Sequence, residues 1–243
     1  MTDKSKVVKE VFENTAQYLK YDYNLQIRKE TVLSFTKDLH FASILDIPSG
    51  TGAMSIPLLN QADKLTMIDI SSNMLSIAQS NIPPAELHKT EIINADFFSL
   101  DLKEQNYDLI ICLGLLAHVN SPEQLLNRVS VLLKPNGILI IQNTDSKHFY
   151  NHLIRLYLGL KNMISKQPYT LNKVSGIFLE QTLAKQGLKL ERKFRYNQSF
   201  LGLSNLFSND QKYNLTRHFF GDSNNNKHAS WGSDVTYLFR KNK

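Results

Sequence analysis

Short runs of apolar residues alternate with helical patterns through the middle of the chain. The runs cover residues 43–47, 65–70, 91–95, 108–115 and 137–142, and each is nearly continuous. Strands of this kind are typical of a parallel sheet, which helices cover on both faces. The alternation therefore predicts a doubly wound α/β fold with right-handed crossovers.

The segment 121–134 carries the clearest helix-end signals. Ser121 can cap the helix, Pro122 suits its first position, and Gln124 completes a capping-box pattern. The turn residues that follow, 135–137, are Pro, Asn and Gly, and they lead into the next strand.

The two ends of the chain are less regular. Apolar residues at helical spacing predict helices within 5–38, where Tyr18, Tyr21 and Tyr23 form an aromatic cluster. After 142 we expect helical patches in 143–172, a helix over 174–187, a half-exposed strand over 188–196 and a last strand over 234–241. The polar, Asn-rich stretch 197–230 predicts a long surface loop or an insertion. No linker divides the chain, so we expect a single domain over 1–243.

The composition of the chain restricts its possible cysteine chemistry, its location and its binding partners. One cysteine, Cys112, excludes an internal disulfide and a thiolate zinc cluster. The sequence shows neither an apolar run long enough to span a bilayer nor the apolar core of a secretory leader. We therefore expect a cytoplasmic location. The net charge is +6, but residues 1–120 hold 10 Lys and Arg against 15 Asp and Glu, so the second half is basic. That half suits an acidic substrate, a nucleic acid or a membrane surface, or is simply a solvated face.

Three acidic residues follow three consecutive strands. Asp46 precedes a glycine-rich turn containing Gly50 and Gly52, where backbone can approach a ligand closely. Asp69 ends the second strand, where a carboxylate can accept both hydroxyls of a ribose. Asp96 follows the third strand beside Phe97, a pairing that suits the amino group and ring of adenine.

Two other nucleotide-binding patterns are absent. A nicotinamide-binding loop needs glycine or alanine where this chain has Ser55, and the lysine of a triphosphate-binding loop is missing. Asp46 would also repel a pyrophosphate.

The motif series LDIPSGTG, IDISSNML, ADFF, YDLIICLGLLAHV and LLKPNGILII, within residues 40–142, resembles that of class I S-adenosylmethionine-dependent methyltransferases. The resemblance implies a Rossmann-like sheet of seven strands with the last one antiparallel. It implies a helical lid from residues 1–40, a cofactor-binding core over 41–142, and acceptor-side insertions with the final strands over 143–243.

The same resemblance implies S-adenosylmethionine as cofactor and assigns its contacts. These residues are Arg28, Asp46, Gly50, Gly52, Asp69, Ile70, Met74, Asp96, Phe97, Leu113 and Gly114. Asp46, the two glycines of the turn, Leu113 and Gly114 would face the methionine part, and Arg28 its carboxylate. Asp69 would hold the ribose, with Ile70, Met74, Asp96 and Phe97 around the adenine. Pro48 departs from the family pattern, which often has glycine there.

The acceptor is less constrained by sequence. Motifs for methylating nucleobase amines or cytosine carbon are missing, and no carboxylate cluster suggests a metal, so an oxygen or nitrogen of a small molecule is the expected acceptor. His118, after the fourth strand, is the candidate base, or else it packs the turn there. Basic residues of the second half favour an anionic acceptor: Lys147, Arg155, Lys161, Lys166, Arg195 and Arg217. The alternatives are an RNA methyltransferase and an inactive cofactor-binding partner subunit.

Overall fold

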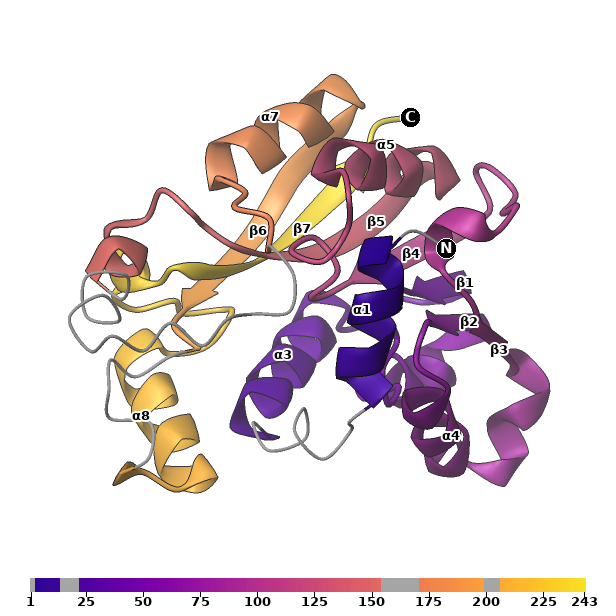
Figure 1. Cartoon of the computed structure of the whole chain (residues 1–243), viewed down its shortest axis with the longest axis horizontal. Coiled ribbons are helices and arrows are strands. Elements are labelled where there is room, and N and C mark those ends of the chain that lie inside the picture. The colour runs from indigo at the N-terminus through magenta and orange to yellow at the C-terminus, as the bar shows by residue number, and fades with distance from the viewer. Residues whose placement is uncertain (1–2, 14–21, 154–170, 199–205) are drawn as a thin grey trace.

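A computed structural model describes residues 3–13, 22–153, 171–198 and 206–243 of the chain. Within these ranges seven strands form one sheet in the order β3-β2-β1-β4-β5-β7-β6 (Figure 1). The strands are β1 (Phe41–Asp46), β2 (Ala62–Asp69), β3 (Thr90–Asn94), β4 (Tyr107–Cys112), β5 (Leu133–Thr144), β6 (Leu188–Tyr196) and β7 (Asp234–Lys241). Strands β1 to β5 pair in parallel, whereas β7 is antiparallel to both β5 and β6. The predicted sheet is confirmed.

Helices cover both faces of this sheet. On one face lie α3 (Asp22–Phe35), α4 (Ser72–Asn81) and α8 (Asn209–Phe220), and on the other α5 (Pro122–Leu132) and α7 (Gly176–Lys185). Side chains of β4 alternate between the two cores, with Leu109 on the first side and Ile110 on the second. This double burial explains why the central strands read as continuous apolar runs.

The helix that the sequence places over 121–134 is confirmed as α5. The Ser121 hydroxyl accepts a hydrogen bond from the Gln124 amide at 3.2 Å, as a cap should. The predicted turn at 135–137 instead lies inside β5, where the register against β4 shifts between Tyr107 and Leu109. Asn136 there takes a positive φ of 63°, so the turn residues form a bulge in the strand.

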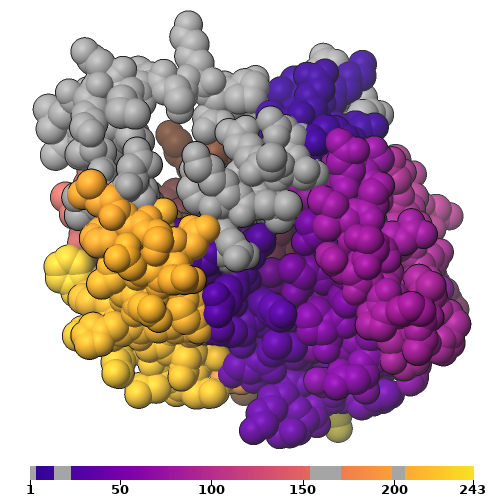
Figure 2. All heavy atoms as spheres, turned by 90° about the horizontal axis from the view of Figure 1, so that it is seen from below, coloured from indigo at the N-terminus to yellow at the C-terminus, as the bar shows by residue number. Residues whose placement is uncertain are grey.

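The expectation of a long surface loop over 197–230 is wrong, because α8 occupies Asn209–Phe220. Ser208 and Gln211 form a complete capping box at its start. The buried positions Lys212, Thr216 and Phe220 are spaced four residues apart, but only one of them is apolar. A hydrophobic pattern therefore could not reveal this helix, which packs beside α3 (Figures 1 and 2).

The N-terminal region predicted as helical over 5–38 forms two helices in the described residues, α1 (Asp3–Glu13) and α3. Tyr23 is buried in the core, whereas Tyr18 and Tyr21 lie outside the described residues. In the stretch predicted to hold helical patches, residues 149–153 are helical, and residues 154–170 lie outside the described residues. None of the described helices has the length and apolar character needed to cross a bilayer.

Candidate functional site

A cavity of about 370 Å³ lies where the carboxyl ends of β1, β2, β3 and β4 meet, with α1 across it. The sheet order reverses beside β1, and ligands of open α/β sheets bind in the crevice that such a reversal creates. The candidate base His118 and all cofactor contacts assigned from sequence line this cavity, except Asp46 and Gly52. Its volume is in the range of small-molecule sites.

The loop after β1 forms one wall. The amide of Ile47 donates to the Ile111 carbonyl at 2.9 Å, and the amide of Ser49 donates to the Ile68 carbonyl at 3.0 Å, so the loop is tied to both neighbouring strands. Gly50 has a φ of 52°, which favours glycine, and nothing lies within 4 Å of the position a Cβ would take. The backbone there is open to a ligand.

Gly52 serves packing instead. Its φ is 71°, and an added Cβ would lie 2.4 Å from Cδ1 of Ile56. The segment beyond it forms the short 3-10 helix η1 (Ile56–Gln61). Gly52 thus shapes the turn from behind the cavity wall.

Asp69 stands at the end of β2 with its carboxylate held by two backbone amides. Oδ2 accepts from the Gly50 amide at 2.8 Å, and Oδ1 accepts from the Ser71 amide at 2.9 Å. Burial raises the pKa of Asp69, and these hydrogen bonds act against the increase. The carboxylate is therefore fixed in position at the cavity wall before any ligand arrives.

Asp46 is buried beneath the glycine loop. The Ser55 hydroxyl donates to its Oδ2 at 2.5 Å, and burial raises the pKa of Asp46 to about 7 despite that bond. The negative charge of Asp69 contributes to this increase in the pKa. Near neutral pH this carboxyl is poised between its two protonation states, and a cation nearby would favour the ionised one.

Asp96 and the two phenylalanines after it form the opposite wall. The Asp96 Oδ1 accepts from the Phe98 amide at 3.1 Å. Phe97 is buried, and the Arg128 guanidinium lies 4.7 Å from the centroid of its ring. Phe97 lines the cavity, and Ile70 and Met74 line it as well.

Leu113 and Gly114 close the cavity at the end of β4. Gly114 has a φ of 91°, and no atom lies within 4 Å of where its Cβ would be. Like Gly50, it offers backbone to a ligand without a side chain in the way.

The chain is similar in sequence to known methyltransferases. Residues 45–141 match a family model described as a methyltransferase domain. A ubiquinone biosynthesis O-methyltransferase from Hydrogenovibrio crunogenus is 24% identical over 150 residues, 60% of this chain and 61% of the relative. A demethylmenaquinone methyltransferase from Tropheryma whipplei is 27% identical over 180 residues, 66% of this chain and 71% of the relative.

Solved structures agree on the fold. An S-adenosylmethionine-dependent methyltransferase from Thermotoga maritima, described as a possible histamine N-methyltransferase, superposes with a TM-score of 0.66 at 16% identity, covering 99% of this chain and 100% of the other. Magnesium protoporphyrin IX methyltransferase from Synechocystis, with bound S-adenosylhomocysteine, gives 0.65 at 14% identity, covering 98% and 100%. Residues 45–141 therefore form a methyltransferase domain, and the chain has the fold of S-adenosylmethionine-dependent methyltransferases. The comparisons give no support to the RNA-methylating or inactive alternatives.

The cavity suits S-adenosylmethionine, the cofactor that the sequence motifs imply. The cofactor carries a sulfonium and an amine against one carboxylate. The charged side chains among the described lining residues are Arg28, Asp69 and Asp96, so acids outnumber cations. Two open glycine positions and the buried Ser49 hydroxyl, which has no partner among the described atoms, add room and hydrogen-bonding capacity.

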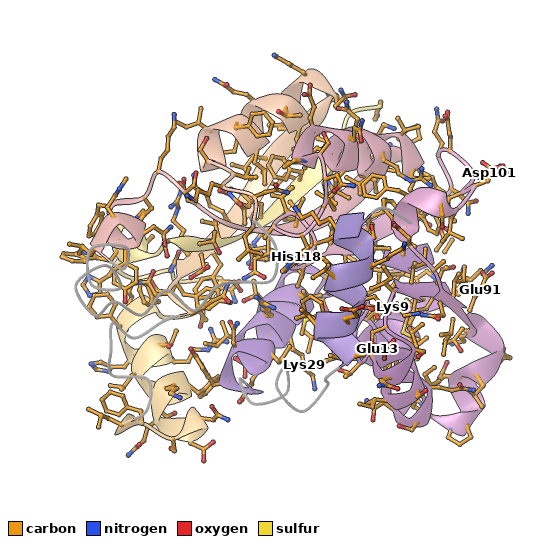
Figure 3. All side chains as sticks on the ribbon, viewed as in Figure 1. Lys9, Glu13, Lys29, Glu91, Asp101 and His118 are labelled. Carbon is orange, nitrogen blue, oxygen red and sulfur yellow. The ribbon has the colours of Figure 1, made fainter. Side chains whose placement is uncertain are left out.

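His118 lines the methyltransferase cavity beside α1 (Figure 3). Its ring meets that of Phe12 edge to face, with centroids 5.2 Å apart. Burial lowers the pKa of His118 to about 4, and the charges of Lys4 and Arg28 contribute. The imidazole is therefore neutral at physiological pH and has a nitrogen able to accept a proton, although as a weak base.

Helix α1 contributes residues that the sequence did not single out. Lys4 donates to the Val119 carbonyl at 2.7 Å. At the other end of the helix, Glu13 accepts from the amides of Ser72 and Asn73 at 3.1 and 3.2 Å, at the start of α4 (Figure 3). The apolar stripe of α1, which includes Val8, was the only signal in the sequence, and it does not reveal these polar contacts.

Of the basic residues that suggested an anionic acceptor, the three that the structure describes do not line the cavity. Arg195 lies 3.9 Å from the Asp145 carboxylate, and Arg217 forms an ion pair with Glu30. Lys147 is exposed elsewhere, and the other three, Arg155, Lys161 and Lys166, lie outside the described residues. Among the described residues, no group of three His, Cys, Asp or Glu side chains is placed to hold a metal ion.

Proposed function

We propose that this methyltransferase transfers the methyl group to an oxygen or nitrogen of a small, largely apolar, ring-bearing acceptor. The observation that carries this proposal is the uncharged His118 imidazole in a cavity whose other walls include Val8, Phe12, Leu25 and Val119. An apolar wall suits an aromatic ring, and a neutral imidazole can take a proton from a hydroxyl or amine on it.

The relatives support this acceptor class. One is named for ubiquinone biosynthesis O-methylation and the other for methylation of demethylmenaquinone. The described cavity offers one cation, Arg28, and the cofactor carboxylate is its proposed ligand. We therefore propose a neutral acceptor in place of the anionic one that the basic half of the sequence suggested.

The cofactor contacts follow from where each residue stands. Asp69 would bind the ribose, and Asp96 with Phe97 the adenine, which Ile70 and Met74 flank. The Gly50 and Gly114 backbone and Leu113 would surround the methionine part, with Asp46 supplying negative charge from behind its wall and Gly52 shaping the turn. Bound S-adenosylmethionine supplies an electrophilic methyl group, so the protein contributes mainly alignment of the acceptor and removal of its proton.

The test is a methyl-transfer assay with a panel of acceptors. Formation of S-adenosylhomocysteine should be fastest with phenols, hydroquinones or aromatic amines, and slow with phosphorylated analogues of the same ring. Activity confined to the phosphorylated compounds would refute the neutral acceptor. Failure to bind S-adenosylhomocysteine in calorimetry would refute the cofactor site itself.

The cytoplasmic location and the single-domain organisation stay predictions.

A further inference from the structure

Gln198, the second residue after β6, uses all of its polar groups in contacts that join α3 to the sheet. Its amide donates to Oδ2 of Asp234 at 2.8 Å, and its side-chain Nε2 donates to Oδ1 of the same residue at 2.8 Å. Its side-chain oxygen accepts from Asn24 at 2.9 Å and from Arg28 at 3.2 Å. Its carbonyl accepts from the Tyr23 hydroxyl.

Asp234 is the fixed end of this chain of contacts. It is the first residue of β7 and is 4% exposed. Its backbone pairs with Thr144 of β5 on one side and with Tyr196 of β6 on the other. The Thr144 hydroxyl also donates to Oδ1 at 2.5 Å. Strands on both sides therefore determine where this carboxylate stands.

Arg28 is the end of the chain of contacts that reaches the cavity. It lies on α3, and it is the one Lys or Arg among the described residues that line the cavity. An arginine side chain has many rotamers, and a ligand that binds it pays less entropy when contacts have already restricted them. Gln198 supplies such a contact from a position that Asp234 determines.

The chemistry of an amide suits this place between a carboxylate and a guanidinium. Glutamine donates through its nitrogen and accepts through its oxygen at the same time. An ionised glutamate could accept from Arg28 but could not donate to Asp234, and the two carboxylates would repel each other. A leucine of similar size could do neither.

We propose that Gln198 is a positioning residue that holds the Arg28 guanidinium at the cavity wall by anchoring it to the buried Asp234. This inference rests on the proposed function, in which Arg28 binds the cofactor carboxylate. Gln198 itself does not line the cavity, so it acts on the cofactor only through Arg28.

A double-mutant cycle tests the proposal, with dissociation constants for S-adenosylhomocysteine measured by calorimetry. Arg28→Ala should weaken binding tenfold or more, and Gln198→Leu three- to tenfold. In the Arg28→Ala background, Gln198→Leu should change affinity by less than twofold. If the two effects multiply instead, Gln198 does not act through Arg28 and the proposal is overturned.

Controls separate the other outcomes. Gln186→Leu removes a glutamine hydrogen bond to Asn127, 2.8 Å long, between α7 and α5, and should leave affinity unchanged. If Gln198→Leu does not fold, Gln198→Asn keeps the amide but shortens its reach, and the same cycle applies. Lack of binding by the unmodified protein would refute the proposed function. Normal binding by Arg28→Ala, with binding lost in Asp69→Ala, would refute the Arg28 role and this inference while leaving the function intact.

Discussion

The hydroxyl of Ser5 in α1 donates a hydrogen bond to Oδ2 of Asp96 at 2.9 Å, and both residues line the cavity. Asp96 is the carboxylate proposed to meet the adenine amino group. A residue of the covering helix therefore occupies an acceptor oxygen that the cofactor would use, and cofactor binding has to compete with this contact.

Removing that competitor should strengthen cofactor binding. A hydrogen bond is worth roughly 0.5–1.5 kcal/mol net, so we expect Ser5→Ala to tighten S-adenosylhomocysteine binding by about two- to tenfold. Calorimetry measures this directly. Ser76→Ala, which removes a hydroxyl on the exposed side of α4, is the matched control. Weaker binding by Ser5→Ala would mean that α1 assists the cofactor through this serine.

Asp69 should dominate cofactor affinity. Its carboxylate is held by the amides of Gly50 and Ser71, so it meets the ribose without reorganising. We expect Asp69→Ala to weaken binding by more than about tenfold, since bonds to charged groups contribute roughly 1.5–3 kcal/mol. Asp63→Ala, which removes an exposed carboxylate of β2, should have no effect. Equal affinities for the two variants would refute the ribose contact.

Cofactor binding should release a proton near neutral pH. Burial raises the pKa of Asp46 to about 7, and a positive amine beside it would lower that pKa, so the fraction still protonated loses its proton on binding. Affinity should therefore rise between pH 6 and pH 8. Calorimetry in buffers of different ionisation enthalpy measures the released proton, and Asp46→Asn should abolish the release. Proton uptake would contradict the proposed placement of the amine.

The same carboxyl gives the protein without cofactor a distinct pH dependence. Because the pKa of Asp46 is raised in the folded state from an ordinary value of 3.8, folding favours its protonated form. Its contribution to stability is full below about pH 4 and is lost as pH rises through about 7. Thermal unfolding at pH 5 and pH 8 should show Asp46→Asn losing part of this dependence. An unchanged dependence would show that Asp46 titrates normally.

His118 should affect turnover and not cofactor affinity. General bases contribute roughly 10²–10⁴-fold, and this one is weak, so we expect His118→Ala to lower kcat about a hundredfold with an unchanged Kd for S-adenosylhomocysteine. With the pKa lowered to about 4, the rate should show no histidine ionisation between pH 6 and pH 8. His40→Ala, an exposed histidine paired with Asp63, is the control. An unchanged kcat would leave His118 only a packing role.

The sequence predicted the sheet well and the acceptor region poorly. The central strands bury both faces, so their apolar runs mark them without any tertiary information, and β7 occupies the residues predicted, 234–241. The sequence pattern did not predict helix α8, because two of its buried positions are the polar residues Lys212 and Thr216. These residues are buried because α3 and β6 lie beside the helix. Arg195 and Arg217 lie next to the carboxylates of Asp145 and Glu30, which are distant in sequence, so the sequence alone could not reveal these pairings.

The sequence by itself determined the fold class, and it predicted the cofactor and most of the residues that line the cavity, because these depend on local patterns at the ends of strands. Only the tertiary structure decided that Asp46 and Gly52 stand behind the cavity wall, that Ser5 contacts Asp96, and that Gln198 joins Arg28 to Asp234. Each of these depends on which distant segments packing brings within hydrogen-bonding distance, and on the burial that shifts a pKa. The spacing of residues along the chain reveals neither the contacts between distant segments nor the burial of a side chain.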